Sequence, residues 1–263
     1  MRRGPVVAAA VAGCGFVAGV FPVFESDLFW HLASGRWILE HGAVPRSDPF
    51  RFTAEAAPWI DHEWLFQVVV RGLEAAGGLD ALILLRATAL ALFALLLFAS
   101  GRRAGLPEGL AGLVALAATL GARPRFLVRP EIVTLFGVVV LLGRVERIAR
   151  PRDERWKEPR ARSGWTLVAL VVVWVQFHGE AMLAPGLAFL SLLGGALASP
   201  PAARRSRATW GLVFGLPALL AAALLANPYG WRLIEVPLGI ARALADLPAA
   251  NPEWRSSFAA PQP

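Results

Sequence analysis

Cysteine is almost absent from this chain, since Cys14 is the only one among its 263 residues. A single thiol excludes a disulfide framework within the chain and a metal site built from cysteines. The sequence also lacks a glycine-rich phosphate loop, a nucleophile elbow and a Ser-His-Asp order, which excludes the common motifs of soluble nucleotide-binding proteins and hydrolases. No repeat with a period of about 20 to 50 residues is present, so a solenoid is excluded as well.

Charged residues are scarce too. They make up 17% of the chain, against 56% hydrophobic residues, and the mean hydropathy is +0.54. Long apolar runs alternate with short stretches that hold most of the charge, which is the pattern that a bilayer imposes. The composition therefore predicts an integral membrane protein. The net charge of +7 comes without a recognition motif, so we expect no nucleic-acid partner.

The apolar runs predict an all-α, polytopic fold with about seven transmembrane helices in a single membrane domain, residues 1–263. Each run approaches the roughly 20 residues that cross a bilayer core of about 30 Å. The weakest run is 106–122, which is rich in Ala and Gly and has Glu108 near its start. The predicted spans are residues 5–24, 79–100, 106–122, 126–143, 164–177, 181–198 and 209–226.

The N-terminus allows two interpretations. Arg2 and Arg3 followed by an apolar run fit either a cleaved signal or a retained first span, and the residues before Cys14 resemble a lipoprotein cleavage box. We favour a retained span, because only a short apolar stretch precedes Cys14 and the run continues past it to Phe24.

Basic residues indicate the orientation of these spans. With a cytoplasmic N-terminus, the inner connections carry fifteen of the 26 Lys and Arg, in accordance with the positive-inside rule. The longest of them, 144–163, is interpreted as a solvated basic connector near anionic lipid. The inner connections are 1–4, 101–105, 144–163 and 199–208, and the outer segments include the loop 25–78 and the C-terminal segment 227–263.

The outer loop 25–78 is the longest connection, and connections of this length usually carry function or structure of their own. Its sequence predicts two interfacial helices. The first covers 28–41, where Trp30 and Trp37 project from the same face. The second begins at Asp61, which is a favourable N-cap residue.

Several short stretches carry a resemblance to a known family. They are Asp27-Leu28-Phe29-Trp30-His31, Gly42-Ala43-Val44-Pro45, Asp61-His62-Glu63-Trp64, Trp174-Val175-Gln176-Phe177-His178-Gly179 and Asn227-Pro228-Tyr229-Gly230-Trp231. A first span followed at once by acids and then by two interfacial helices resembles the polytopic GT-C type glycosyltransferases. These include protein mannosyltransferases and bacterial lipid A aminoarabinose transferases, and the stretches are similar to a bacterial subgroup of that superfamily.

The resemblance implies transfer of a sugar from a polyprenyl-phosphate donor to a lipid or glycan acceptor, at the outer face of the bacterial cytoplasmic membrane. Membrane lipids are then further partners. In the family the acid just after the first span is catalytic, which corresponds to Asp27, with Glu25 as the nearby substitute. Because Asp is also common at helix N-caps, capping of the 28–41 helix is an equally weighted interpretation of Asp27.

Arg123, Arg125 and Arg129 stand together at a predicted outer membrane edge, against the positive-inside trend. Guanidinium groups bind phosphate oxygens in pairs, so these arginines are candidates for holding the donor phosphate. The alternatives are snorkelling to lipid headgroups and pairing with Glu131.

Three histidines fall on the predicted outer side beside acids. His31 follows Asp27, His62 precedes Glu63, and His178 lies two residues before Glu180. We assign the last two pairs to substrate binding, and a divalent metal ion held by His31, His62 or His178 is a candidate cofactor. In the alternative interpretation these groups bond only to each other or to the backbone.

Other function classes stay open at this point. A transporter or lipid flippase would explain Arg86, a charge inside the second predicted span. A non-catalytic scaffold or a truncated module is the third alternative, because enzymes of the GT-C type usually have more spans.

Overall fold

The computed structural model describes residues 4–52, 58–149 and 160–246. These residues are helical apart from short connections and one isolated β-bridge between Ser47 and Pro58. The predicted all-α class is therefore confirmed. Parts of the predicted inner connections 1–4 and 144–163, and of the C-terminal segment 227–263, lie outside the described residues.

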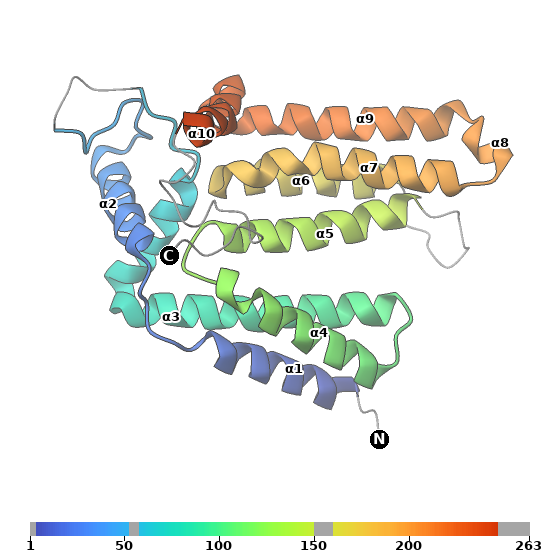
Figure 1. Ribbon diagram of the computed structural model, residues 1–263, viewed down its shortest axis with the longest axis horizontal. Coiled ribbons are helices and arrows are strands. Elements are labelled where there is room, and N and C mark those ends of the chain that lie inside the picture. Colours follow the sequence, from blue (N-terminus) through green and yellow to red (C-terminus); the bar gives the residue numbers. More distant parts are fainter. Residues whose placement is uncertain (1–3, 53–57, 150–159, 247–263) are drawn as a thin grey trace.

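The helices α1, α3, α4, α5, α6, α7 and α9 run side by side along the long axis of the molecule (Figure 1). In chain order the helices are α1 (Gly4–Gly19), α2 (Ser26–His41), α3 (Trp64–Arg103), α4 (Glu108–Ala122), α5 (Glu131–Ala149), α6 (Arg160–Phe177), α7 (Leu183–Ala198), α8 (Pro201–Arg204), α9 (Arg207–Ala223) and α10 (Glu235–Asp246). Single 3-10 turns are η1 (Arg123–Arg125), η2 (Gly179–Met182), η3 (Leu224–Ala226) and η4 (Gly230–Ile234).

The two ends of this bundle differ. The turn between α3 and α4, the short α8 and the start of α1 lie at one end, where α5 also ends and α6 begins (Figure 1). The helices α2 and α10 and the first turns of α3 lie at the opposite end, which we call the site end. Within the described residues, the predicted inner connections thus share one end and the predicted outer loop lies at the other.

Three helical stretches among the described residues are long and apolar enough to cross a membrane. They are Trp64–Arg103, Gly179–Ala198 and Arg207–Ala226, and Gly4–Gly19 and Gly164–Phe177 are apolar but shorter. Large apolar side chains such as Leu92, Leu190 and Phe214 point outward from the bundle. An apolar outer surface is what contact with lipid requires. The count of seven spans stays a prediction.

The helices at the site end begin and end at positions that the local sequence explains. Helix α2 ends where Gly42 adopts a left-handed conformation, with φ of 63°, and its N–H donates to the Ile38 carbonyl. The predicted second interfacial helix and second span are joined in α3, which kinks at Gly77 and Gly78. Gly78 has φ of 64°, a conformation that residues with a Cβ rarely adopt.

The predicted first span, 5–24, is helical only as far as Gly19, where α1 ends. Two further predicted boundaries are wrong. Asp61 does not cap a helix, because α3 begins at Trp64 and the Asp61 carboxylate instead accepts a hydrogen bond of 2.7 Å from Gln67. The predicted span 126–143 is helical only from Glu131, the first residue of α5. Pro130 explains the second difference, because proline lacks an N–H and disfavours helical geometry in the residue before it.

Small residues allow the helices to approach closely. A Cβ on Gly19 of α1 would lie 2.5 Å from the Cα of Ala87 in α3, and Gly15 packs one turn earlier against the same helix. A Cβ on Gly35 of α2 would lie 2.2 Å from the Gln67 carbonyl oxygen of α3. Such small-residue contacts are typical of helix packing within membranes. The contact at Gly35 fixes α2 against the start of α3.

One charge is buried inside the bundle. Arg86 of α3 is fully buried and lies 3.5 Å from the Glu25 carboxylate, which is fully buried as well. Its guanidinium also donates to the carbonyls of Gly19 and Phe21 and stacks over the Phe21 ring. Arg86 therefore ties α3 to the segment that follows α1.

Candidate functional site

A cavity of about 190 Å³ opens at the site end, between α2, the start of α3 and the start of α5. Its lining consists of polar and charged side chains with one tryptophan and one proline: Asp27, Trp30, His31, Glu63, Arg129, Pro130 and Glu131. Polar groups from three segments far apart in the sequence thus converge on one cavity, which is the usual form of a binding or active site.

Asp27 and Arg129, which both line this cavity, form an ion pair. Asp27 lies in the first turn of α2, its side chain is 53% exposed, and its carboxylate lies 2.8 Å from the Arg129 guanidinium. Arg129 belongs to the non-helical residues before α5. The preceding Val128 N–H donates to the buried Glu25 carboxylate at 2.9 Å, which fixes this segment against the start of α2.

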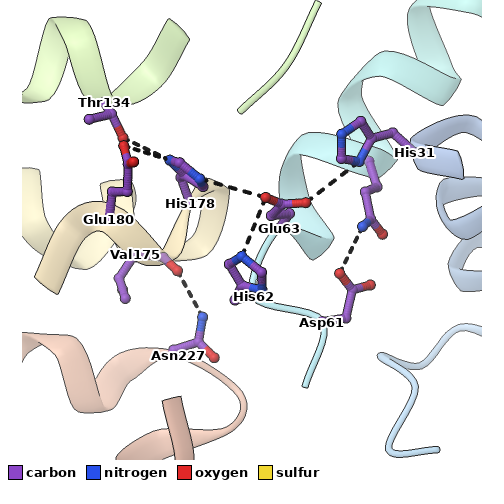
Figure 2. A network of polar contacts seen from close by, with 10 residues as sticks. His31, Asp61, His62, Glu63, Thr134, Val175, His178, Glu180 and Asn227 are labelled. Carbon is purple, nitrogen blue, oxygen red and sulfur yellow. Dashed lines mark hydrogen bonds and ion pairs between the residues drawn. The ribbon is translucent and has the colours of Figure 1, made fainter. Parts of the chain in front are cut away.

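Glu63, at the N-cap position of α3, is the centre of a second group of contacts (Figure 2). One carboxylate oxygen lies 3.3 Å from His62 Nε2 and 3.6 Å from His178 Nε2. The other oxygen lies 3.7 Å from His31 Nδ1. A single carboxylate therefore faces three histidines, each from a different part of the site.

His178 is held from its opposite side. Its Nδ1 lies 2.8 Å from the Thr134 hydroxyl of α5 and 3.4 Å from the Glu180 carboxylate (Figure 2). Trp174 donates from its indole nitrogen to the same hydroxyl at 3.1 Å. These contacts leave the His178 ring with one defined orientation, in which Nε2 points to Glu63.

Burial and charge move the pKa values in this group. Burial lowers the pKa of His31 below its usual value, although the Glu63 carboxylate opposes the change. Burial alone would also lower the pKa of His62, but the hydrogen bond and negative charge of Glu63 raise it overall. Burial would raise the pKa of Glu63, and the surrounding histidines nevertheless hold it below its usual value. Burial, together with the nearby Glu63 charge, raises the pKa of Asp61 to about 6.

Outer hydrogen bonds join the loops around the site. Trp64 donates to the Gln176 side chain at 3.2 Å, and the Asn227 amide donates to the Val175 carbonyl at 2.8 Å. The Tyr229 hydroxyl donates to the Pro45 carbonyl. Burial raises the pKa of Tyr229 to about 12, so this hydroxyl stays a donor at neutral pH. The stretches that carry the family resemblance thus meet in one place.

Most of the site residues predicted from sequence come together here, as Asp27, Arg129, His31, His62, Glu63, His178 and Glu180 do. The other three predicted site residues lie outside this group of contacts. Glu25 is buried against Arg86, Arg123 donates to the Ala18 carbonyl and lies over the Phe21 ring, and Arg125 is exposed in η1.

Two residues of the site were not assigned to it from the sequence. Glu131 lines the cavity, and Thr134 orients His178. Glu131 had a usable signal, because an acid inside the predicted span 126–143 is costly unless it serves a function. Thr134 had none, because its role depends on a histidine from a distant segment, between α6 and η2.

These groups could accept a proton, bind an anion or hold a metal ion. The cavity offers carboxylates that can accept a proton, a guanidinium that can hold an anion, and Trp30, whose ring packs against Phe50 and Trp59 at centroid distances of 4.8 and 5.8 Å. His62, Glu63 and His178 could hold a metal ion, because their ligand atoms lie within 4.8 Å of one another. Comparisons with protein-family models, with curated proteins and with solved structures give no match.

Proposed function

We propose that this protein is a membrane glycosyltransferase of the GT-C type, which transfers a sugar from a polyprenyl-phosphate donor to a lipid or glycan acceptor. The observation that carries the proposal is the cavity in which Asp27 and Arg129 lie 2.8 Å apart. A carboxylate and a guanidinium at one opening supply the two groups that such a transfer needs, a base for the acceptor and a cation for the leaving phosphate.

In the proposed reaction, the acceptor hydroxyl oxygen attacks the anomeric carbon of the donor sugar. The bond from that carbon to the phosphate oxygen breaks, and its electron pair stays with the polyprenyl phosphate. The acceptor proton passes to the Asp27 carboxylate. When the donor binds, before this step, Arg129 exchanges its contact with Asp27 for the donor phosphate, where a charge-assisted hydrogen bond stabilises the charge that develops as the bond breaks.

The position of the cavity supports a lipid-linked donor. It opens where apolar helices end and α2 begins, and α2 carries the exposed aromatic side chains Phe29 and Trp30. Exposed aromatic rings of this kind are typical of the membrane–water interface. A polyprenyl chain would therefore stay in the lipid while its phosphate reaches the cavity.

The membrane arrangement is part of the proposal. We infer that α1, α4, α5 and α6 cross the bilayer together with the three long apolar helices, which gives seven spans in the bacterial cytoplasmic membrane. The predicted Arg-rich connections that are described share the end opposite the cavity. By the positive-inside rule that end is cytoplasmic, as is the N-terminus, and the cavity faces outward.

The transporter alternative gains no support from Arg86, the residue that suggested it. Its guanidinium is committed to the Glu25 carboxylate and to two backbone carbonyls, and its side chain is fully buried. A charge sealed in this way contributes to helix packing and is not offered to a passing solute.

The proposal is tested with purified protein in lipid nanodiscs, a radiolabelled polyprenyl-phosphate sugar and an extract of envelope lipids and glycans as acceptor. Asp27→Asn should lower the turnover number by roughly 10² to 10⁴, because it removes the base and keeps the side-chain shape. Asp80→Asn is the matched control, since Asp80 is exposed on α3 and does not line the cavity.

Two results would contradict this function. One is the absence of transfer from every polyprenyl-phosphate donor supplied, alongside uptake of a solute into proteoliposomes. The other is transfer that Asp27→Asn and Asp80→Asn leave equally intact, which would remove Asp27 from the chemistry.

A further inference from the structure

His62, Glu63 and His178 place their ligand atoms around one point beside the cavity. The two Nε2 atoms lie 3.3 and 3.6 Å from the same Glu63 oxygen, and all three atoms lie within 4.8 Å of one another. A zinc ion bonded tetrahedrally at about 2.0 to 2.2 Å keeps its ligand atoms about 3.3 to 3.6 Å apart. Two edges of the triangle therefore already have the length of a zinc coordination shell.

The surroundings of His178 favour metal binding through Nε2. Its Nδ1 faces the Thr134 hydroxyl at 2.8 Å and the Glu180 carboxylate at 3.4 Å, and the hydroxyl already accepts a bond from Trp174. A proton on Nδ1 satisfies both oxygen atoms and leaves the Nε2 lone pair directed at Glu63. Carboxylate and hydroxyl partners of this kind orient metal-binding histidines and fix their tautomer.

The close approach of His62 to His178 depends on the absence of a side chain at Gly179. A Cβ on Gly179 would lie 2.8 Å from the His62 ring, so only glycine allows the ring to approach the turn that carries His178. The two imidazole planes are inclined by 24° with centroids 6.1 Å apart. Both rings approach the same Glu63 oxygen (Figure 2).

Unsatisfied polar atoms around Glu63 also point to a ligand. The His31 side chain is 6% exposed, and its Nδ1, directed at the second Glu63 oxygen from 3.7 Å, has no hydrogen-bond partner among the described residues. The same holds for the buried Oε2 of Glu131. Three carboxylates line this cavity with one guanidinium, and a cation would offset that negative charge.

We propose that His62, Glu63 and His178 bind a divalent transition-metal ion, and that Zn²⁺ is the ion whose ligand types and spacing they match. Three protein ligands leave a fourth position for water or substrate, as in catalytic zinc sites. The ion would lie beside the cavity, because Glu63 also lines it. Its role in holding a donor phosphate oxygen opposite Arg129 rests on the function proposed above, whereas the metal site itself does not.

The test measures metal directly. Protein purified in detergent is stripped with a chelator and dialysed, Zn²⁺ is returned, and bound metal is measured by mass spectrometry. Co²⁺ serves as a second probe, because a tetrahedral site gives it intense visible absorption. We expect about one ion per chain in the unsubstituted protein. His62→Asn, Glu63→Gln and His178→Asn should each weaken binding by at least about 100-fold, and Glu180→Gln by roughly 10- to 100-fold.

His41→Asn is the matched control, because His41 lies at the exposed end of α2 with its Nδ1 at the Trp37 carbonyl. It should bind metal as the unsubstituted protein does. Thermal unfolding of each variant without metal identifies any variant that fails to fold, and the unsubstituted protein alone suffices to overturn the proposal if it takes up neither ion. Equal binding by His41→Asn, His62→Asn and His178→Asn would overturn it as well.

Sugar transfer is measured on the same samples. Transfer by a protein that binds neither ion overturns the metal site and leaves the glycosyltransferase proposal intact. Metal binding with the expected loss in the three ligand variants, but without transfer from any donor, supports the metal site and contradicts the glycosyltransferase function.

Discussion

The Asp27 carboxylate of α2 lies 2.8 Å from the Arg129 guanidinium, which belongs to the residues just before α5. This contact lines the cavity and brings together two segments that the sequence separates by the helices α3 and α4 and the turn η1. Glu63, with the histidines around it, lines the same cavity. The predictions below address the ion pair, the packing that supports it and the membrane arrangement around it.

Arg129 should determine how tightly the donor binds. Arg129→Gln removes a charge-assisted contact to phosphate, so the KM for the polyprenyl-phosphate donor should rise by about 10- to 100-fold. Arg125→Gln is the control, since Arg125 belongs to the same predicted cluster but is exposed and does not line the cavity. Steady-state kinetics at varied donor concentration measure the effect. Equal KM values for the two variants would assign the phosphate to another group.

Gly35 should be essential for seating α2 on α3. Gly35→Ala places a Cβ 2.2 Å from the Gln67 carbonyl oxygen, and such overpacking costs roughly 1 to 3 kcal/mol of folding free energy. Gly72→Ala is the opposite case, because no atom lies within 4 Å of the added Cβ and the helix should gain about 0.5 to 1 kcal/mol. Thermal unfolding in detergent measures both, and a Gly35→Ala protein as stable as the unsubstituted one would contradict the packing described.

Arg86 and Glu25 should behave as one buried unit. Arg86→Met or Glu25→Gln alone leaves a partner charge buried without its counterion, which typically costs roughly 3 to 5 kcal/mol. The double variant should lose less than the sum of the two single losses, because neither charge is left behind. Unfolding free energies from a denaturant series complete this cycle. Strictly additive losses would show that the two groups do not interact.

The orientation of the chain can be tested by labelling. In a Cys14→Ser background, Glu40→Cys lies on the exposed end of α2, and Ala104→Cys lies on the exposed turn after α3. A membrane-impermeant maleimide added to intact cells should label the first cysteine, and should label the second only after the cells are permeabilised. The reverse pattern would place the cavity on the cytoplasmic side and would contradict the outer-face reaction.

Sequence alone was sufficient for the helices, because apolar runs and breaking residues are local signals. Each predicted span contains a helix, although α1 ends at Gly19, before the predicted end of the first span. The two interfacial helices of the outer loop are α2 and the part of α3 before the kink at Gly77. Local signals failed at two further boundaries. The Asp61 carboxylate accepts a hydrogen bond from the Gln67 side chain in the helix that follows it, and Pro130 delays the start of α5 to Glu131.

For the site too, some features follow from the sequence and others only from the tertiary structure. The sequence by itself determined which residue types were present for chemistry, including an acid after the first span and histidines beside acids in the predicted outer segments. It could not separate Asp27 from Glu25, or Arg129 from Arg125, because neighbours in a segment share their composition and differ only in direction. Tertiary packing decided those directions. Glu25 turns inward to Arg86, Asp27 turns to the cavity, and Glu63 meets His178 only because α5, η2 and the start of α3 meet at one end of the bundle.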